Sequence, residues 1–362
     1  MGRTKLFTPG PVPIDEHILQ IGAQQPPYNR TQEFSDFTFE ILANLQYVFQ
    51  TSGQVAIFSA SGTAAMEATV VNFVDSASKV LIINCGTFGQ RWIDLCDVYS
   101  ISYEEFRLEP GQSLDMDELQ MRLKEGRFST LFATAHETST GFLSDIERIG
   151  KLTRQYKVLY VVDGISSILA DQFLMDEWNV DVAVLSSQKA LALPPGLSFV
   201  AVGERAREKL VGKKCRSLYF DLENYFRNQE RGQLPYTPAI CLMRQLHERL
   251  RNVKEQTLPQ IIQQHKDRAD FFRDGLKSLP LQMVTVQKSN AMTALSSDKF
   301  DALKIVSELD KTYQMTVAPN TGELRHRVFR VAHMGAQTLE DLSSLLSALD
   351  ECLSNPATSM TN

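Results

Sequence analysis

The sequence has few cysteines, no long hydrophobic run and no excess of basic residues. Its five cysteines are scattered and form no Cys-x-x-Cys pair, so they indicate neither a disulfide framework nor a zinc site. The six histidines show no His-x-x-x-His spacing, which would place two metal ligands on one face of a helix. We therefore expect no metal site.

The charge balance and the hydropathy exclude further classes. Lys and Arg number 37 against 43 for Asp and Glu, giving a formal net charge of −6, so a nucleic-acid backbone or an anionic membrane is a poor partner. The longest apolar runs, such as 158–162 and 182–185, are far shorter than the roughly 18 residues that span a bilayer. The first residues carry no signal-peptide core, and we expect a cytoplasmic protein.

The composition is typical of a folded globular protein, and the length excludes a small binding module. Charged residues make up 22% of the 362 residues and hydrophobic ones 43%, close to the averages for globular proteins. At about 150 residues per domain, this length predicts two domains.

Between residues 54 and 202, short apolar runs alternate with helical patterns. This alternation predicts a doubly wound α/β domain whose mostly parallel sheet is flanked by helices on both faces. The predicted strands are residues 55–58, 80–83, 101–106, 130–133, 158–162, 182–185 and 197–202.

After residue 203 the pattern changes, and it predicts a smaller C-terminal α+β domain. Helical patterns run from 239 to about 277 and again over 300–313 and 339–353. Short strands are predicted at 281–286, 292–295, 315–317 and 328–331. The expected division is an N-terminal arm (1–15), a large domain (16–255), a small domain (256–353) and a disordered tail (354–362).

Two predicted strands end in residues suited to catalysis. The strand 158–162 leads into Asp163, and the strand 182–185 leads through Gln188 into Lys189. Ligands of open α/β sheets bind at the carboxyl ends of the strands, where a buried carboxylate needs a cationic partner and a desolvated lysine favours imine chemistry. Taken singly, Asp163 is explained as well by a turn or a helix cap, and Lys189 by a surface charge.

Two further segments also follow predicted strands. At Ser61, Gly62 and Thr63 a small-residue turn enters an Ala-rich helix, whose free N–H groups can bind an anion. The turn matches neither a P-loop nor a G-x-G-x-x-G fingerprint, which argues against nucleotides. Phe88 stands between two glycines and could stack on a planar ligand. A plain helix cap and a core phenylalanine are the alternatives.

Together, the anion cradle, flat aromatic ring, carboxylate and lysine are the set that pyridoxal phosphate requires. The sequence also resembles a known family, the fold-type I, class V aminotransferases. It is similar to the group that contains alanine–glyoxylate, serine–pyruvate and 2-aminoethylphosphonate–pyruvate transaminases. The resemblance covers almost the whole chain and rests on the segments 6–11, 136–141, 186–189 and 329–335.

The resemblance implies a role for each cofactor-binding residue. Lys189 would form the Schiff base with pyridoxal phosphate and then move the proton, and Asp163 would keep the pyridine nitrogen protonated. Phe88 would stack on the ring. The other implied cofactor contacts are Ser61, Gly62, Thr63 and Gln188 around the phosphate and Thr138 near the 3′-hydroxyl.

The resemblance also implies substrate and subunit contacts. Arg330 would bind a substrate carboxylate or phosphonate through its planar fork, and Gly10 would lie over the substrate. Thr237, or else Tyr236, would reach the phosphate bound by a partner subunit. A homodimer with shared active sites is therefore expected.

The predicted function is transfer of an amino group from a small amine to a 2-oxo acid such as pyruvate or glyoxylate. The chain length, the segment 217–221 and the single strong arginine at 330 suit a small donor, namely 2-aminoethylphosphonate, alanine or serine, but do not separate the three. Of these donors, 2-aminoethylphosphonate is preferred. The alternative is an alanine–glyoxylate or serine–pyruvate aminotransferase. Cysteine desulfuration is disfavoured because no cysteine lies between residues 241 and 352 to serve as the late-chain thiol. A non-catalytic protein that binds the cofactor is a further alternative.

Overall fold

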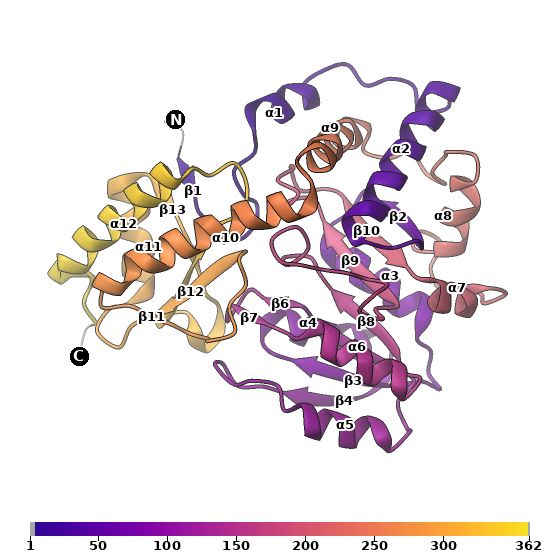
Figure 1. Cartoon of the computed structure of the whole chain (residues 1–362), viewed down its shortest axis with the longest axis horizontal. Coiled ribbons are helices and arrows are strands. Elements are labelled where there is room, and N and C mark those ends of the chain that lie inside the picture. The colour runs from indigo at the N-terminus through magenta and orange to yellow at the C-terminus, as the bar shows by residue number, and fades with distance from the viewer. Residues whose placement is uncertain (1–3, 361–362) are drawn as a thin grey trace.

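The computed structural model describes residues 4–360 and contains two packed units (Figure 1). The larger one surrounds a sheet of seven strands, and the smaller one surrounds a sheet of four. Each sheet has its own cluster of buried apolar side chains. The two units meet beside the carboxyl ends of the larger sheet's strands, with the long helices α9 (Ile240–Gln256) and α10 (Leu258–Gly275) leading from one to the other.

The large sheet confirms the α/β prediction. Its strand order is β2-β10-β9-β8-β5-β3-β4, and β10 is the one strand among them that runs antiparallel to its neighbours. The bounds are β2 (Gln54–Phe58), β3 (Lys79–Asn84), β4 (Ser102–Arg107), β5 (Thr130–Thr134), β8 (Leu159–Asp163), β9 (Val182–Ser186) and β10 (Ser198–Val202). Strands β5, β8, β9 and β10 are buried along their whole length, which explains why the sequence shows them as continuous apolar runs.

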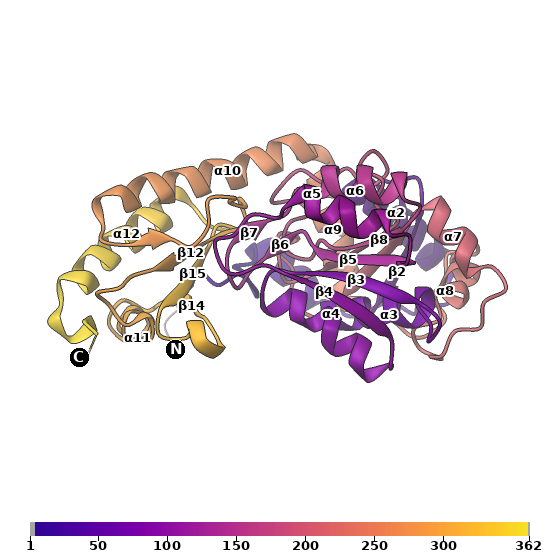
Figure 2. The ribbon, with the colours of Figure 1, turned by 90° about the horizontal axis from the view of Figure 1, so that it is seen from below.

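Helices cover both faces of this sheet. Figure 2 shows α5 (Met116–Lys124) and α6 (Ile146–Gln155) on one face, and α3 (Gly62–Phe73) and α4 (Thr87–Val98) on the other. Helix α6 begins at Asp145, whose side chain accepts a hydrogen bond from the backbone N–H of Arg148. The other helices of this unit are α1 (Glu16–Gly22), α2 (Gln32–Phe49), α7 (Glu204–Leu210) and α8 (Leu222–Gln229).

The smaller sheet has the order β11-β12-β15-β14; α10 and α11 pack against its strands, and α12 packs against these two helices. The bounds are β11 (Gln282–Met283), β12 (Met292–Ser296), α11 (Ala302–Tyr313), β13 (Met315–Thr316), β14 (Ala318–Pro319), β15 (Val328–Ala332) and α12 (Leu339–Ser354). The N-terminal arm joins this unit, because β1 (Lys5–Leu6) pairs with β13 and Phe7 is buried in the smaller core.

The structure differs from the sequence-based expectation in three places. The long helical pattern is divided at Thr257, whose φ of 67° ends α9 before α10 begins. Of the strand expected over 281–286, only the two residues of β11 are ordered as strand, and both are exposed. The tail expected to be disordered from residue 354 is folded as far as Met360. There the Thr358 hydroxyl donates to the Cys352 carbonyl and Met360 N–H to the Lys299 carbonyl. Residues 361 and 362 lie outside the described part of the chain.

Among the described residues, no helix is both long and apolar enough to cross a membrane. No group of three or more His, Cys, Asp or Glu side chains within residues 4–360 could hold a metal ion.

Candidate active site

The carboxyl ends of β2, β3, β5, β8 and β9 point to one edge of the large sheet, because these strands all run in the same direction. Each is followed by one of the predicted segments: residues 61–63 after β2, Phe88 after β3, Thr138 after β5, Asp163 at the end of β8 and Lys189 after β9. The fold therefore brings segments that are far apart in the sequence to one place.

Lys189 is buried at this edge, with only 9% of its surface exposed. Its Nζ donates a hydrogen bond to the Pro9 carbonyl at 2.6 Å and lies 6.0 Å from the centre of the Phe88 ring. Burial, and then the nearby charge of Arg330, lower the pKa of the Lys189 amine to about 8. Near neutral pH, an appreciable fraction of this amine is thus unprotonated and nucleophilic.

Asp163 is also buried, at the end of β8. Its Oδ1 accepts a hydrogen bond from the Ile165 N–H at 2.9 Å, while its Oδ2 has no hydrogen-bond partner among residues 4–360. Burial raises the pKa of Asp163 to about 6, and the Ile165 hydrogen bond and the charges of Arg91 and Lys189 oppose that rise. The carboxylate is therefore ionised at pH 7 and has one oxygen available for a cationic ligand atom.

The turn from β2 into α3 has the shape of an anion cradle. Ser61 is the N-cap residue of α3, but its side chain makes no capping hydrogen bond. A Cβ on Gly62 would lie 2.5 Å from Ile165 Cδ1, so a larger residue there would require the Ile165 side chain to move. The Arg91 guanidinium donates a hydrogen bond to Thr63 Oγ1 at 3.1 Å and adds a positive charge beside the helix N-terminus.

Phe88 lies in the first turn of α4, and its backbone is hydrogen-bonded to the side chain of Glu137. One carboxylate oxygen of Glu137 accepts from the Phe88 and Gly89 N–H groups, each at 3.0 Å. The other accepts from the backbone N–H and the hydroxyl of Ser139, at 3.0 and 2.6 Å. The position of the Phe88 ring, over which the Arg91 guanidinium lies at 4.8 Å, thus depends on a fully buried carboxylate.

Arg330 reaches the site from β15 of the smaller unit. Its Nη1 donates to the Thr138 carbonyl at 3.3 Å and its Nη2 to the Pro319 carbonyl at 2.6 Å. The Nε is buried and has no hydrogen-bond partner among residues 4–360. This guanidinium stands close enough to Lys189 to lower the pKa of the amine, and it has an unused donor.

The N-terminal arm covers Lys189 from the opposite side. Gly10 has a φ of +146°, and a Cβ built on it would lie 2.7 Å from Lys189 Nζ. Glycine is therefore required at this position both by the backbone conformation and by the lack of space.

Thr237 and Tyr236 lie at the surface of this chain. Thr237 is exposed, and two residues later the Ala239 N–H donates to Ser59 Oγ at 2.8 Å, in the turn that leads to Ser61. Tyr236 stacks on Tyr219 with ring centres 5.2 Å apart and donates to the Leu218 carbonyl. Gln188 is half-buried between β9 and Lys189.

The sequence-based prediction missed three groups that the structure places in the site: Arg91, Glu137 and the Pro9 carbonyl. Arg91 follows Phe88 by three residues, and Glu137 lies in the segment 136–141 that carries the family resemblance. The signal that could have indicated Arg91 is its place one helical turn after the loop that follows β3. For Glu137, it is a charged residue close to the end of the buried strand β5. The contact between Pro9 and Lys189 joins residues 180 positions apart and has no local signal.

Comparison with known proteins gives consistent matches along the chain. The family model described as aminotransferase class V matches residues 24–326. A serine–glyoxylate aminotransferase of Arabidopsis thaliana is 31% identical over 345 residues, 92% of this chain and 86% of the relative. A protein of Anabaena cylindrica named as the 42 kDa subunit of soluble hydrogenase is 31% identical over 354 residues, 96% of this chain and 92% of the relative.

Solved structures show the same similarity. The crystal structure of an alanine–glyoxylate aminotransferase from Nostoc sp. superposes with a TM-score of 0.93 at 29% sequence identity. The match covers 98% of this chain and 96% of that one, so it includes both units and the arm.

Proposed function

Because the chain belongs to the class V aminotransferase family, and so is a transaminase that uses pyridoxal phosphate, we propose that it transfers the amino group of alanine or serine to glyoxylate. The observation that carries the proposal is that Gly10 of the arm and the guanidinium of Arg330 both lie close to Lys189. One guanidinium beside the amine suits the single carboxylate of alanine, serine or glyoxylate. The named relatives favour this alternative over the 2-aminoethylphosphonate donor preferred from the sequence.

The residues present fit the cofactor. The N-terminus of α3 and Arg91 suit the phosphate, and Ser186 Oγ, buried without a partner, stands 3.2 Å from where a Cβ on Gly62 would be. Asp163 has an unpaired oxygen for the ring nitrogen, and Phe88 offers a flat face. When bound, pyridoxal phosphate supplies an aldehyde that combines with amines and a ring that accepts the electron pair left at the substrate Cα.

Lys189 is the residue that moves the proton in this proposal. Its amine is buried, has a lowered pKa and sits under the arm, where water has little access. When it is not bonded to the cofactor, the neutral amine would take the proton from the substrate Cα and would then give a proton to C4′ of the cofactor.

Arg330 orients the substrate in this proposal. The buried Nε donor and the planar guanidinium suit a carboxylate in a bidentate arrangement. The hydrogen bonds to the Thr138 and Pro319 carbonyls hold the side chain in place before substrate binds.

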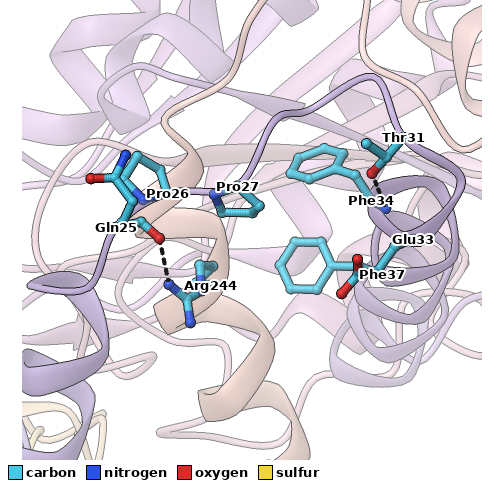
Figure 3. A pocket seen from close by; sticks show the side chains of 8 residues that line it. All are labelled: Gln25, Pro26, Pro27, Thr31, Glu33, Phe34, Phe37 and Arg244. Atoms are coloured by element: carbon cyan, nitrogen blue, oxygen red, sulfur yellow. Dashed lines mark hydrogen bonds between the residues drawn. The ribbon is translucent and has the colours of Figure 1, made fainter.

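We further propose a homodimer in which Thr237 reaches the phosphate of the partner's site. Beside exposed Thr237, the surface is apolar: Leu218 is 82% exposed, and Tyr236 and Tyr219 stack behind it. A hollow with apolar walls also lies between Pro26, Pro27 and the Phe37 ring, and Arg244 of α9 lines it (Figure 3). Apolar surface of this kind is typical of an interface between subunits.

A donor panel tests the proposal. Initial rates with alanine, serine, aspartate and 2-aminoethylphosphonate are measured against glyoxylate and pyruvate. Alanine or serine with glyoxylate should give the highest kcat/KM, and Lys189→Ala should lower it by about 10³-fold or more. A 2-aminoethylphosphonate–pyruvate pair that exceeds the others by orders of magnitude would overturn the substrate assignment.

A further inference from the structure

A second cationic cavity, of about 240 Å³, lies beside the loop that follows Lys189. Its walls come from α9, from α10, from Ala192 of this loop and from the turn at Gly335. None of the residues proposed to bind cofactor or substrate lines it. The cavity lies where the large unit, the small unit and the arm meet.

Arg249 of α9 is the first cationic group of the cavity. Its Nε donates a hydrogen bond to the Leu191 carbonyl at 3.0 Å, while its two terminal nitrogens have no hydrogen-bond partner among residues 4–360. Within those residues, no carboxylate forms an ion pair with it. Burial lowers the pKa of Arg249, which reflects the cost of keeping this charge away from water.

Arg268 of α10 is the second. Its Nη1 donates to the carbonyls of Gly335 and Gln337, at 2.9 and 3.1 Å, and its Nε is buried without a partner. Arg268 likewise forms no ion pair within residues 4–360. Burial, and then the like charge of Arg249, lower the pKa of Arg268 to about 10, so both guanidinium groups are charged at neutral pH.

The other ionisable groups of the cavity do not balance these charges. His265 donates from Nδ1 to the Ile261 carbonyl, and burial lowers its pKa to about 3, so it stays neutral with its Nε2 unpartnered. Asp15 is the one carboxylate that lines the cavity, and it is exposed and caps α1 through the His17 N–H. Two half-buried cations thus face one exposed anion, whose charge opposes the lowering of the Arg249 pKa.

We propose that this cavity binds a small oxyanion, such as inorganic phosphate or a short dicarboxylate, between Arg249 and Arg268. The unused donors of two guanidinium groups match the acceptor oxygens of such an ion. The bound charge removes the repulsion between the two arginines and satisfies donors that the protein leaves unpaired.

The site also connects parts of the molecule that surround Lys189. Arg249 holds the carbonyl of Leu191, two residues after the catalytic lysine. Arg268 holds the turn at Gly335, and the next residue, Ala336, donates its N–H to Pro13 of the arm. An anion bound to both arginines therefore links the lysine loop to the arm and stabilises their arrangement.

Thermal unfolding of the cofactor-loaded enzyme tests this site, because the phosphate cradle is then filled. Titration with inorganic phosphate and, separately, malonate should raise Tm saturably, by about 2 °C or more for at least one of the two ions. Arg249→Gln should abolish the rise. The matched control Arg251→Gln, an exposed arginine on the same helix, should keep it, and so should Arg330→Gln at the substrate site.

A second variant keeps the test decisive if Arg249→Gln does not fold. Asn252 lines the same cavity, and Asn252→Asp would supply a carboxylate from the protein itself. We expect a higher Tm without added anion and no further rise with phosphate. A rise that persists in Arg249→Gln, that disappears in Arg330→Gln, or that is absent from the wild type for both ions would overturn the proposal.

Discussion

At Lys189, two opposing influences set the protonation of a single amine. Desolvation and the charge of Arg330 lower its pKa to about 8, while Asp163 acts in the opposite direction. An ordinary lysine, at 10.5, would be almost entirely protonated at pH 8, whereas about half of this one is neutral. The chemistry of the residue thus depends on its surroundings more than on its type.

The pH dependence of cofactor capture follows from this shift. Because only the neutral amine attacks an aldehyde, the rate at which the apoenzyme binds pyridoxal phosphate should rise with pH and level off above about 8. Arg330→Gln removes the second largest cause of the shift, so the midpoint should move to higher pH, and exposed Arg327→Gln should leave it unchanged. Stopped-flow absorbance across the pH range measures both midpoints, and an unchanged value in Arg330→Gln would contradict the assignment.

Glu137 provides a second prediction at this scale. Replacing it with Gln puts an N–H donor where backbone N–H groups now donate, so at least one of the hydrogen bonds to Phe88 N–H, Gly89 N–H or Ser139 is lost. The Phe88 ring should lose its fixed position. We expect kcat/KM to fall by about 10-fold or more, with a weaker visible circular dichroism signal from the bound cofactor.

The control for this variant is Glu109→Gln, since Glu109 is exposed and pairs only with Arg107 and Gln112 among the described residues. Normal kinetics and a normal cofactor signal in Glu137→Gln would show that Phe88 does not depend on the buried carboxylate.

In the N-terminal arm, the backbone conformation of Gly10 bears on function, because Gly10 lies against Lys189. Gly10→Ala should lower kcat/KM by about 10-fold or more, because the added Cβ would come within 2.7 Å of Lys189 Nζ. Gly126 also has a positive φ but open space around it, so Gly126→Ala carries the backbone strain alone. Stability and steady-state kinetics of the two variants separate the two effects, and equal kinetic losses would contradict a role for the arm.

The strands of the large sheet were predictable because burial on both faces leaves continuous apolar runs, as in 182–186. The positions of the turn at residues 61–63, of Asp163 and of Lys189 could be predicted because each follows closely on one of these apolar runs. The strand predicted over 281–286 was too long, because only Gln282 and Met283 pair with β12 at the exposed edge of the smaller sheet. The division of the long helix at Thr257 was also missed, since a threonine with φ of 67° is set by tertiary packing and not by a local breaker.

The folded tail shows the same limit. Its order comes from hydrogen bonds between residues 358–360 and the distant segment 299–301, which composition alone does not reveal. For the same reason, the sequence does not predict the contact of Pro9 with Lys189, because that contact depends on the pairing of β1 with the distant β13.

At the scale of the whole molecule, the proposed site draws on both units and on the arm. Lys189 and Asp163 come from the large unit, Arg330 from the small one and Gly10 from the arm. The exposed Thr237 beside the apolar patch at Leu218 suggests that a second chain adds the last contact. A dimer would therefore be needed for activity as well as for stability.

Mixed dimers test this arrangement directly. Lys189→Ala and Thr237→Val chains should each have low activity alone, for lack of the amine and of one phosphate contact respectively. If Thr237 serves the partner's site, a dimer of one chain of each kind contains one complete site, with Lys189 from the second chain and Thr237 from the first. When equal amounts of the two proteins are unfolded, mixed and refolded together, about half of the dimers are mixed. Each mixed dimer should have about half of the wild-type activity, so the mixture should recover about a quarter of it.

If Thr237 serves its own chain, no complete site forms in the mixed dimer, and the activity stays at the average of the two variants. The control mixes a chain that carries both changes with a wild-type chain. In its mixed dimers, no site is complete in the shared arrangement, because one site lacks Lys189 and the other lacks Thr237. In the unshared arrangement, the site of the wild-type chain is complete and fully active. The two arrangements thus predict opposite orders of activity for the same pair of mixtures.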